Sequence, residues 1–271
     1  MKNIKFGFIQ GRMTVTPSKK ILQYFPKKNW RKEFYYAKKN NFNFIEYFGE
    51  RKLNKANPIW SYKKLNEINR LVKKNNLFNY SFCDDYFIGK NITKYKNLSK
   101  YYDVIVKNLS LINIKVYVLA LFEKSLIDQK NLNNFVKILQ IVSEKLKYKR
   151  IKLAIECNLD AKLIKKLAIM VNRENFHIVY DTGNRLKKQN LQYKEILNLK
   201  KYICHIHLKD KNWRGQNVIL GTGAVNFQYI FKALKKIKYK ENFTFETNRG
   251  DSPIKTMCEN KSLISNLIQK L

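Results

Sequence analysis

The sequence has few glycine and proline residues, which form interdomain linkers, and few cysteine residues, which form disulfide bonds and metal sites. Its 271 residues include only nine glycines and four prolines, and no glycine-, serine- or proline-rich stretch forms an interdomain linker. The four cysteines, Cys83, Cys157, Cys204 and Cys258, are far apart and lack the CxxC spacing of a zinc site or a redox loop. We therefore expect one domain over residues 1–271, with reduced thiols as in a cytoplasmic protein.

Long hydrophobic runs are also missing. No stretch reaches about 18 uncharged apolar residues, the length that a membrane-spanning helix needs. Residues 1–6 lead directly into an apolar strand, without the apolar core and small-residue cleavage site of a signal peptide. These two absences predict a cytoplasmic protein with no membrane partner.

Acidic residues are scarce beside basic ones. The chain has 20 Asp and Glu against 55 Lys and Arg, a formal net charge of +35. Such a balance suits binding to nucleic acid or to an anionic membrane surface when the basic residues are clustered. Here the lysines are spread along the chain beside asparagines, as in residues 38–41 and 73–76. We interpret them as solvated surface and expect no specific nucleic-acid partner.

What is present is a repeating alternation of two kinds of segment. Short runs rich in Ile, Val, Phe and Tyr predict strands, and the longer Lys- and Leu-rich segments between them have helical periodicity. The predicted strands are Ile4–Ile9, Asn43–Phe48, Phe78–Cys83, Lys115–Leu121, Ile151–Glu156, Phe176–Asp181, Tyr202–His207 and Phe243–Glu246. The predicted helices are Trp30–Asn40, Ser61–Asn75, Asn97–Ile112, Asn131–Lys147, Asp160–Val171, Leu191–Leu199, Asn226–Ile237 and Ile254–Gln269.

Eight strand–helix pairs at this length predict an α/β fold, a single (β/α)8 TIM barrel with a closed parallel sheet. The alternative is a doubly wound open sheet, but Gly7–Arg12 after the first strand does not match a dinucleotide-binding fingerprint. At the helix starts, Ser61, Asp160 and Asn226 are expected to cap free N–H groups. We therefore expect the functional residues at the carboxyl ends of the strands, where barrels of this kind place their catalytic groups.

Four consecutive predicted strands end in a potential metal ligand, namely Glu156, Asp181, His207 and Glu246. Side chains alternate along a strand, so all four are expected to face the barrel axis. Three carboxylates brought together there would be costly to bury without a cation. The pattern predicts a site for one divalent ion, Mn²⁺ or Mg²⁺ first for this oxygen-rich set, with Co²⁺ or Zn²⁺ as alternatives.

Each of these residues also has an ordinary structural interpretation. An aspartate before Thr182 and Gly183 is often a turn residue, and a single glutamate can pair with one of the many lysines. His205 lies one layer deeper than His207, where it either supports the site or packs in the core. Glu46, Asp84, Asp85 and Glu123, beyond strands two to four, are expected to be solvated or paired with lysines.

Cationic and N–H donors on neighbouring loops predict contacts to an anionic substrate. Arg12, Lys209 and Arg214 are the candidate side chains, and the turn Gly221–Gly223 offers backbone N–H groups for a phosphate.

Five segments carry a resemblance to a known family: Ala154–Glu156, Val179–Asn184, His205–Asp210, Leu220–Gly223 and Phe243–Thr247. They resemble the xylose-isomerase-like TIM barrel superfamily, most closely its sugar phosphate isomerase/epimerase group. The start, Gly7–Arg12, is similar to members often associated with polysaccharide gene clusters.

The resemblance implies roles for residues at matching positions. Glu156, Asp181, His207 and Glu246 match the four metal ligands of the family, and Glu156 and Glu246 also match its catalytic acid and base. Asn184 stands where some epimerases place a histidine against the substrate. Ala224 and Asn226 replace acidic residues that are common in that loop.

The implied activity is that of a divalent-metal-dependent sugar or sugar-phosphate isomerase/epimerase, in which carboxylates transfer a proton through an enediolate. The expected partner is a small sugar or sugar phosphate, and a homo-oligomer is left open. The expected substrate contacts are Arg12, Asn184, His205, Lys209 and Arg214. The alternatives are a keto-sugar or keto-inositol dehydratase or lyase on the same metal site, and a non-catalytic basic binding module. An abasic-site endonuclease is disfavoured, because its three zinc ions need more than the three histidines present.

Overall fold

The computed structural model of the chain describes residues 4–18, 21–188 and 191–270. Its main sheet is a closed barrel with the strand order β1-β10-β7-β6-β5-β4-β3-β2, and the described strand pairs within it are parallel. The prediction of a (β/α)8 barrel is therefore confirmed. The chain divides into two compact units, one made of residues up to 45 and from 180 onward, the other of residues 46–179.

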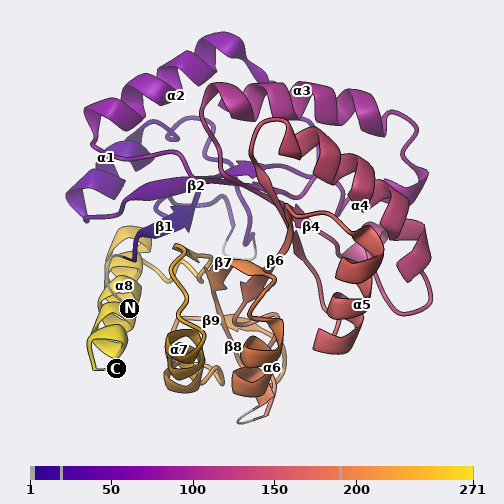
Figure 1. Cartoon of the computed structure of the whole chain (residues 1–271). Helices are drawn as coiled ribbons and strands as arrows, with labels where there is room; N and C mark the ends of the chain where they lie inside the picture. The colour runs from indigo at the N-terminus through magenta and orange to yellow at the C-terminus, as the bar shows by residue number, and fades with distance from the viewer. Residues whose placement is uncertain (1–3, 19–20, 189–190, 271) are drawn as a thin grey trace. The chain divides into compact units, whose positions relative to one another are not determined.

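The first unit contains three central strands whose register aligns their carboxyl ends. β10 lies between β1 and β7 and pairs Phe243 with Phe6 and Thr244 with His207. Helices α6 and α7 pack against each other, and α8 contacts α7 (Figure 1). The barrel strands and the helices that lie wholly in this unit are β1 (Phe6–Ile9), α1 (Lys32–Lys39), α6 (Leu191–Leu199), β7 (Ile203–Leu208), α7 (Phe227–Lys236), β10 (Phe243–Phe245) and α8 (Pro253–Gln269).

The second unit also alternates strands and helices along the chain. β3, β4 and β5 pair in parallel, and α4 packs against both α3 and α5 (Figure 1). Its elements are α2 (Tyr62–Lys74), β3 (Ser81–Asp84), α3 (Leu98–Leu111), β4 (Val116–Ala120), α4 (Leu132–Lys147), β5 (Lys152–Glu156) and α5 (Ala161–Val171). Two further strands, β2 (Phe44–Gly49) and β6 (Phe176–Asp181), cross the limits between the units.

The predicted strand and helix bounds agree with the structure closely, because both periodicities are strong. All five residues of β4 are buried, as expected of a parallel strand covered on both sides. The largest difference is at β3, which begins at Ser81 rather than Phe78, and Phe78 is partly exposed. The apolar run predicts too long a strand because its first residue, Phe78, is partly exposed and lies outside the sheet.

The capping predictions are confirmed at two of three helices. Asp160 accepts a hydrogen bond from the Leu163 N–H at 2.8 Å, and Asn226 accepts one from the Tyr229 N–H at 3.1 Å. The prediction for Ser61 is wrong, because its side chain makes no capping hydrogen bond at the start of α2.

Some features escaped the sequence patterns. A small antiparallel ribbon of β8 (Asp210–Lys211) and β9 (Asn217–Val218) follows β7, and strands of two residues are too short to show a period. Three single turns of 3-10 helix, Pro58–Trp60, Ile92–Lys94 and Glu123–Ser125, connect longer elements. Among the described residues, no helix combines the length and the apolar character needed to cross a bilayer.

Candidate metal centre

Three of the predicted ligands meet at the carboxyl ends of neighbouring strands in the first unit. Asp181 is the last residue of β6, His207 the penultimate residue of β7, and Glu246 directly follows β10. The Glu246 N–H donates to the Leu208 carbonyl at 3.0 Å, which extends the ladder by one residue and fixes the glutamate backbone. One ligand atom of each of the three side chains lies within 4.8 Å of the others, and all three are buried.

The two oxygens of Asp181 have different partners. Oδ1 accepts hydrogen bonds from the Gly183 N–H at 2.8 Å and the Asn184 N–H at 2.7 Å. Oδ2 lies 2.8 Å from the Lys209 ammonium. The aspartate thus serves as the turn residue of the ordinary interpretation through Oδ1, while Oδ2 belongs to the cluster.

Glu246 is surrounded by donors and positive charge. Its Oε1 is 2.8 Å from Lys209 Nζ, accepts a hydrogen bond from Gln23 Nε2 at 2.9 Å, and is 3.6 Å from an Arg12 nitrogen. Its Oε2 is 3.0 Å from His207 Nδ1. Burial alone would raise the pKa of Glu246, but the Lys209 ammonium, His207 and Arg12 hold it well below its usual range. Glu246 is therefore a carboxylate at neutral pH.

The chemistry of this donor set fits a divalent cation. Two carboxylates and one imidazole offer oxygen and nitrogen atoms in the mixture that Mn²⁺, Co²⁺ and Zn²⁺ accept. Ligand atoms on one ion at about 2.0–2.2 Å are separated from one another by less than about 4.4 Å, close to the spread found here. Asp181, His207 and Glu246 can thus contribute to a common coordination sphere after small side-chain movements.

Glu156 lies in the second unit. It is the last residue of β5, it is buried, and its carbonyl accepts a hydrogen bond from the Leu121 N–H at 2.9 Å. Its position at the carboxyl end of a barrel strand is the one predicted from the sequence.

The predicted substrate contacts occupy different environments. Arg12 is fully buried, and its guanidinium donates to the Leu22 carbonyl and to Gln23 Oε1. Asn184 is half-buried beside Asp181, to which its backbone N–H donates.

Of the other three predicted contacts, Lys209 lies beside Asp181 and Glu246, whereas His205 and Arg214 lie elsewhere. His205 is fully buried one layer below His207, with Nε2 3.1 Å from Thr244 Oγ1. Arg214 lies on the exposed turn between β8 and β9, and its backbone N–H bonds to Asn212. Within the described part of the chain, Arg214 makes no hydrogen bond or ion pair with the cluster.

Sequence reasoning missed how the segment between β1 and α1 is anchored. Arg249, three residues after Glu246, donates to the carbonyls of Gly11, Ile21 and Leu22 at 2.8–3.0 Å. This anchoring brings Gln23 onto Glu246. Gln23 lies in an irregular loop far from the quoted motifs, so no sequence pattern marks it.

Glu33 of α1 holds the start of the same segment. Both of its carboxylate oxygens accept from the Gly11 N–H, at 2.8 and 3.0 Å. Burial raises the pKa of Glu33 to about 8, although the N–H groups of Gly11 and Met13 and the charges of Arg249 and Arg12 act in the opposite direction. Glu33 is a structural anchor rather than a member of the cluster.

The expectation that the turn after β7 presents N–H groups to a phosphate is wrong for two of its residues. The N–H groups of Gly221 and Gly223 donate to Asp210 Oδ2 at 2.8 and 2.9 Å. Asp210 Oδ1 accepts a further bond from the Val225 N–H at 3.1 Å. The aspartate therefore organises this loop and uses the donors that a phosphate would need.

The expectation of solvated or lysine-paired acids beyond strands two to four is wrong for Asp84, and Glu46 and Asp85 are buried rather than solvated. Glu46, Asp84 and Asp85 are buried, and Glu46 accepts a hydrogen bond from Ser81 Oγ at 2.5 Å. Glu123 is exposed and pairs with Arg51 at 2.7 Å. Inward and helix-facing positions near the strand ends are buried in this barrel, which charge patterning alone does not reveal.

Asp84 has neutral partners rather than cations. Tyr117 and Tyr101 donate their hydroxyls to its Oδ2, the latter at 2.8 Å, and the Tyr86 N–H donates to Oδ1 at 3.0 Å. Burial raises the pKa of Asp84 to about 6, and these hydrogen bonds offset only part of that effect.

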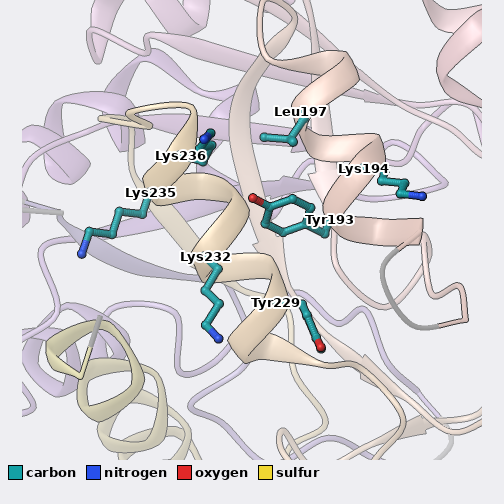
Figure 2. Close-up of a pocket in the computed structure, with 7 residues that line it drawn as sticks. All are labelled: Tyr193, Lys194, Leu197, Tyr229, Lys232, Lys235 and Lys236. Atoms are coloured by element: carbon teal, nitrogen blue, oxygen red, sulfur yellow. The ribbon is translucent and has the colours of Figure 1, made fainter.

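A large groove lies between α6 and α7 (Figure 2). It has a volume of about 960 Å³ and is lined by Tyr193, Lys194, Leu197, Tyr229, Lys232, Lys235 and Lys236. None of the predicted site residues lines it, and it offers no carboxylate, imidazole or thiol to a metal. We therefore take the strand-end cluster, not this groove, as the candidate site.

Comparison with known proteins identifies the family of the barrel. The family model described as xylose isomerase-like TIM barrel matches residues 34–266, which is most of the chain. This chain belongs to the xylose isomerase-like TIM barrel family. No curated protein matches its sequence.

Solved structures resemble this xylose isomerase-like chain over nearly its whole length. D-psicose 3-epimerase with D-tagatose from Clostridium cellulolyticum H10 has a TM-score of 0.76 at 13% identity, covering 98% of this chain and 99% of its own. L-ribulose 3-epimerase also reaches 0.76 at 13% identity, with coverages of 98% and 95%. The IOLI protein with a bound zinc atom reaches 0.74 at 14% identity, with coverages of 98% and 99%. At these identities the likeness establishes the fold.

Proposed function

We propose that this chain is a divalent-metal-dependent sugar or sugar-phosphate isomerase or epimerase. The observation that carries the proposal is the convergence of Asp181, His207 and Glu246 at the carboxyl ends of β6, β7 and β10. Barrel enzymes place their chemistry at that end. The structural neighbours named as sugar 3-epimerases favour sugar chemistry among the activities of the fold.

We assign Asp181, His207, Glu246 and Glu156 as the residues that hold the ion. Glu156 is included because it is buried at the carboxyl end of β5 and matches the family's first ligand. Mn²⁺ or Mg²⁺ suits three carboxylates best, while the zinc atom in the IOLI protein keeps Zn²⁺ as an alternative. Since the family model extends through both units, we also propose that they act as one domain.

When bound, the ion would act as a Lewis acid that stabilises negative charge developing on substrate oxygens next to the reacting carbon. Glu246 enters the reaction as a carboxylate, because its cationic neighbours keep it ionised, and it accepts a proton from the carbon beside a carbonyl. Glu156 serves as the second acid–base group. Return of a proton to the opposite face of the same carbon gives an epimer, and return to the neighbouring carbon interconverts aldose and ketose.

Proton transfer can be tested by hydrogen exchange in deuterated water. Metal-loaded protein is incubated with a panel of ketoses and ketose phosphates, and the deuterium at carbons next to the carbonyl is measured by NMR. We expect incorporation with at least one member of the panel, with loss of about 100-fold or more of the rate in Glu246→Gln because the proton acceptor is removed. Asp181→Ala should lose bound metal as well as exchange.

Asp84→Asn is the matched control. It also changes a buried strand-end carboxylate, but one that contacts tyrosines rather than the cluster, so its exchange rate should equal that of the wild type. Exchange that persists in Glu246→Gln would remove this residue from proton transfer. Metal content unchanged in Asp181→Ala would contradict the proposed centre.

A further inference from the structure

Lys209 occupies an unusual place for a lysine in so basic a chain. It lies one residue beyond the end of β7, and its side chain is only 5% exposed. Its ammonium is 2.8 Å from Asp181 Oδ2 and 2.8 Å from Glu246 Oε1. One cation therefore bridges two of the residues that we assign to the metal.

The backbone fixes this lysine in place. Thr182 Oγ1 donates to the Lys209 carbonyl at 2.6 Å and accepts from the Lys209 N–H at 2.9 Å, so one side chain holds both polar groups of its backbone. The aliphatic part of Lys209 passes over Gly183, where an added Cβ would lie 2.8 Å from Lys209 Cγ. The absence of a side chain at Gly183 leaves room for the lysine to reach inward.

An ammonium and a divalent ion would compete for the negative charge of the same two carboxylates. Each is stabilised in a buried site by the negative charge of the carboxylates, and two cations held within a few ångströms of each other repel strongly where water is excluded. Without any cation, the buried pair Asp181 and Glu246 would repel instead. The ammonium thus supplies the countercharge that a metal would otherwise provide.

We propose that Lys209 is a positioning residue that competes with the divalent ion for Asp181 and Glu246. Its ammonium keeps the two carboxylates close together before the ion binds, and it must leave Asp181 Oδ2 and Glu246 Oε1 when the ion takes those oxygens. Lys209 thereby lowers the metal affinity of the site and stabilises the fold of the metal-free chain. This inference rests on the proposed metal centre and adds a residue that controls it.

Metal affinity provides the direct test. Metal-stripped wild type, Lys209→Met, Lys209→Arg and Lys187→Met are each titrated with Mn²⁺, and the dissociation constant is measured by calorimetry. Lys209→Met should bind Mn²⁺ at least about tenfold more tightly, because the competing charge is gone, while Lys209→Arg should stay close to the wild type. Lys187→Met is the matched control, since Lys187 pairs with Glu195 at 2.6 Å and not with the cluster. Affinity that is unchanged or weaker in Lys209→Met would overturn the proposal.

Thermal unfolding gives a second readout that does not depend on activity. Without metal, Lys209→Met should melt at a lower temperature than the wild type, because two buried carboxylates lose their shared cation. Saturating Mn²⁺ should raise its melting temperature by more than it raises that of the wild type. Equal metal-induced shifts in the two proteins would contradict the role of Lys209. Should Lys209→Met not fold, the same titration is made with Lys209→Gln, which keeps a polar group of similar length.

The outcomes separate this inference from the proposed function. If none of the folded proteins binds Mn²⁺, the metal centre fails, and the role of Lys209 fails with it. If wild type and Lys209→Met bind Mn²⁺ equally well, the metal centre stands and only the competition by Lys209 is refuted.

Discussion

Glu246 and Asp84 are both buried carboxylates at the carboxyl ends of barrel strands, one in each compact unit. Glu246 faces the Lys209 ammonium, His207 and a guanidinium, whereas Asp84 accepts from two tyrosine hydroxyls and one backbone N–H. Burial acts in the same direction on both, yet the pKa of Glu246 is lowered and that of Asp84 is raised to about 6. For these two acids, contact with cations therefore distinguishes the lowered pKa from the raised one.

Neutralising each acid in turn should change the free energy of unfolding by different amounts. Glu246→Gln leaves buried cations without their carboxylate, so we expect it to lower the free energy of unfolding by about 3 kcal/mol at pH 7. Asp84→Asn removes a desolvated charge and keeps an oxygen acceptor for both hydroxyls, but its amide NH2 then faces the Tyr86 N–H, so we expect a loss of no more than about 1 kcal/mol at the same pH. Urea denaturation of the two metal-free variants measures the difference. Equal destabilisation would mean that countercharge is not what distinguishes the sites.

Removing one neutral hydrogen-bond donor from Asp84 should lower the free energy of unfolding by less than Glu246→Gln does. Tyr117→Phe takes one hydroxyl away from Oδ2 and leaves Tyr101 as its remaining tyrosine donor. We expect a loss of about 1–2 kcal/mol in the free energy of unfolding, and a further rise in the pKa of Asp84. Denaturation at pH 7 measures the first, and NMR titration of the Asp84 carboxyl carbon measures the second. A lowered pKa in Tyr117→Phe would contradict the assignment of this hydroxyl as a donor.

The raised pKa of Asp84 also predicts a pH dependence of stability. Between its ordinary value of 3.8 and about 6, the folded chain keeps a proton that the unfolded chain has released. The contribution of Asp84 to the free energy of unfolding is therefore most favourable below about pH 4, and it decreases as the pH rises to 6, by at most about 1.4 kcal/mol per pH unit. Subtracting the curve of Asp84→Asn from that of the wild type isolates this slope. A difference that is flat over this range would show that Asp84 titrates normally.

The fold and the strand ends could be read from the sequence because both depend on local patterns. The alternation of β-branched runs with amphipathic segments located every central strand and helix, and an acidic residue or imidazole ending an apolar strand marked Asp181, His207 and Glu246. Family resemblance strengthened the choice of these residues. Their burial and convergence then follow from the closed parallel sheet.

What could not be read depends on contacts between distant segments. The hydrogen bond from Gln23 to Glu246 joins residues 223 positions apart, through a loop without periodicity. Charge and position predict Lys209 as a substrate contact, but its bridge between Asp181 and Glu246 requires the three-dimensional arrangement. Likewise, only the packing of tyrosines from α3 and β4 shows that Asp84 is buried rather than solvated.

The hydrogen bonds from Arg249 and Arg12 to the segment after β1 limit which of its residues can be substituted. Both guanidiniums bind carbonyl oxygens, those of Gly11, Ile21 and Leu22, and a carbonyl is supplied by every amino acid. The side chains of Ile21 and Leu22 can therefore be exchanged without loss of these hydrogen bonds, since only their carbonyl groups accept them.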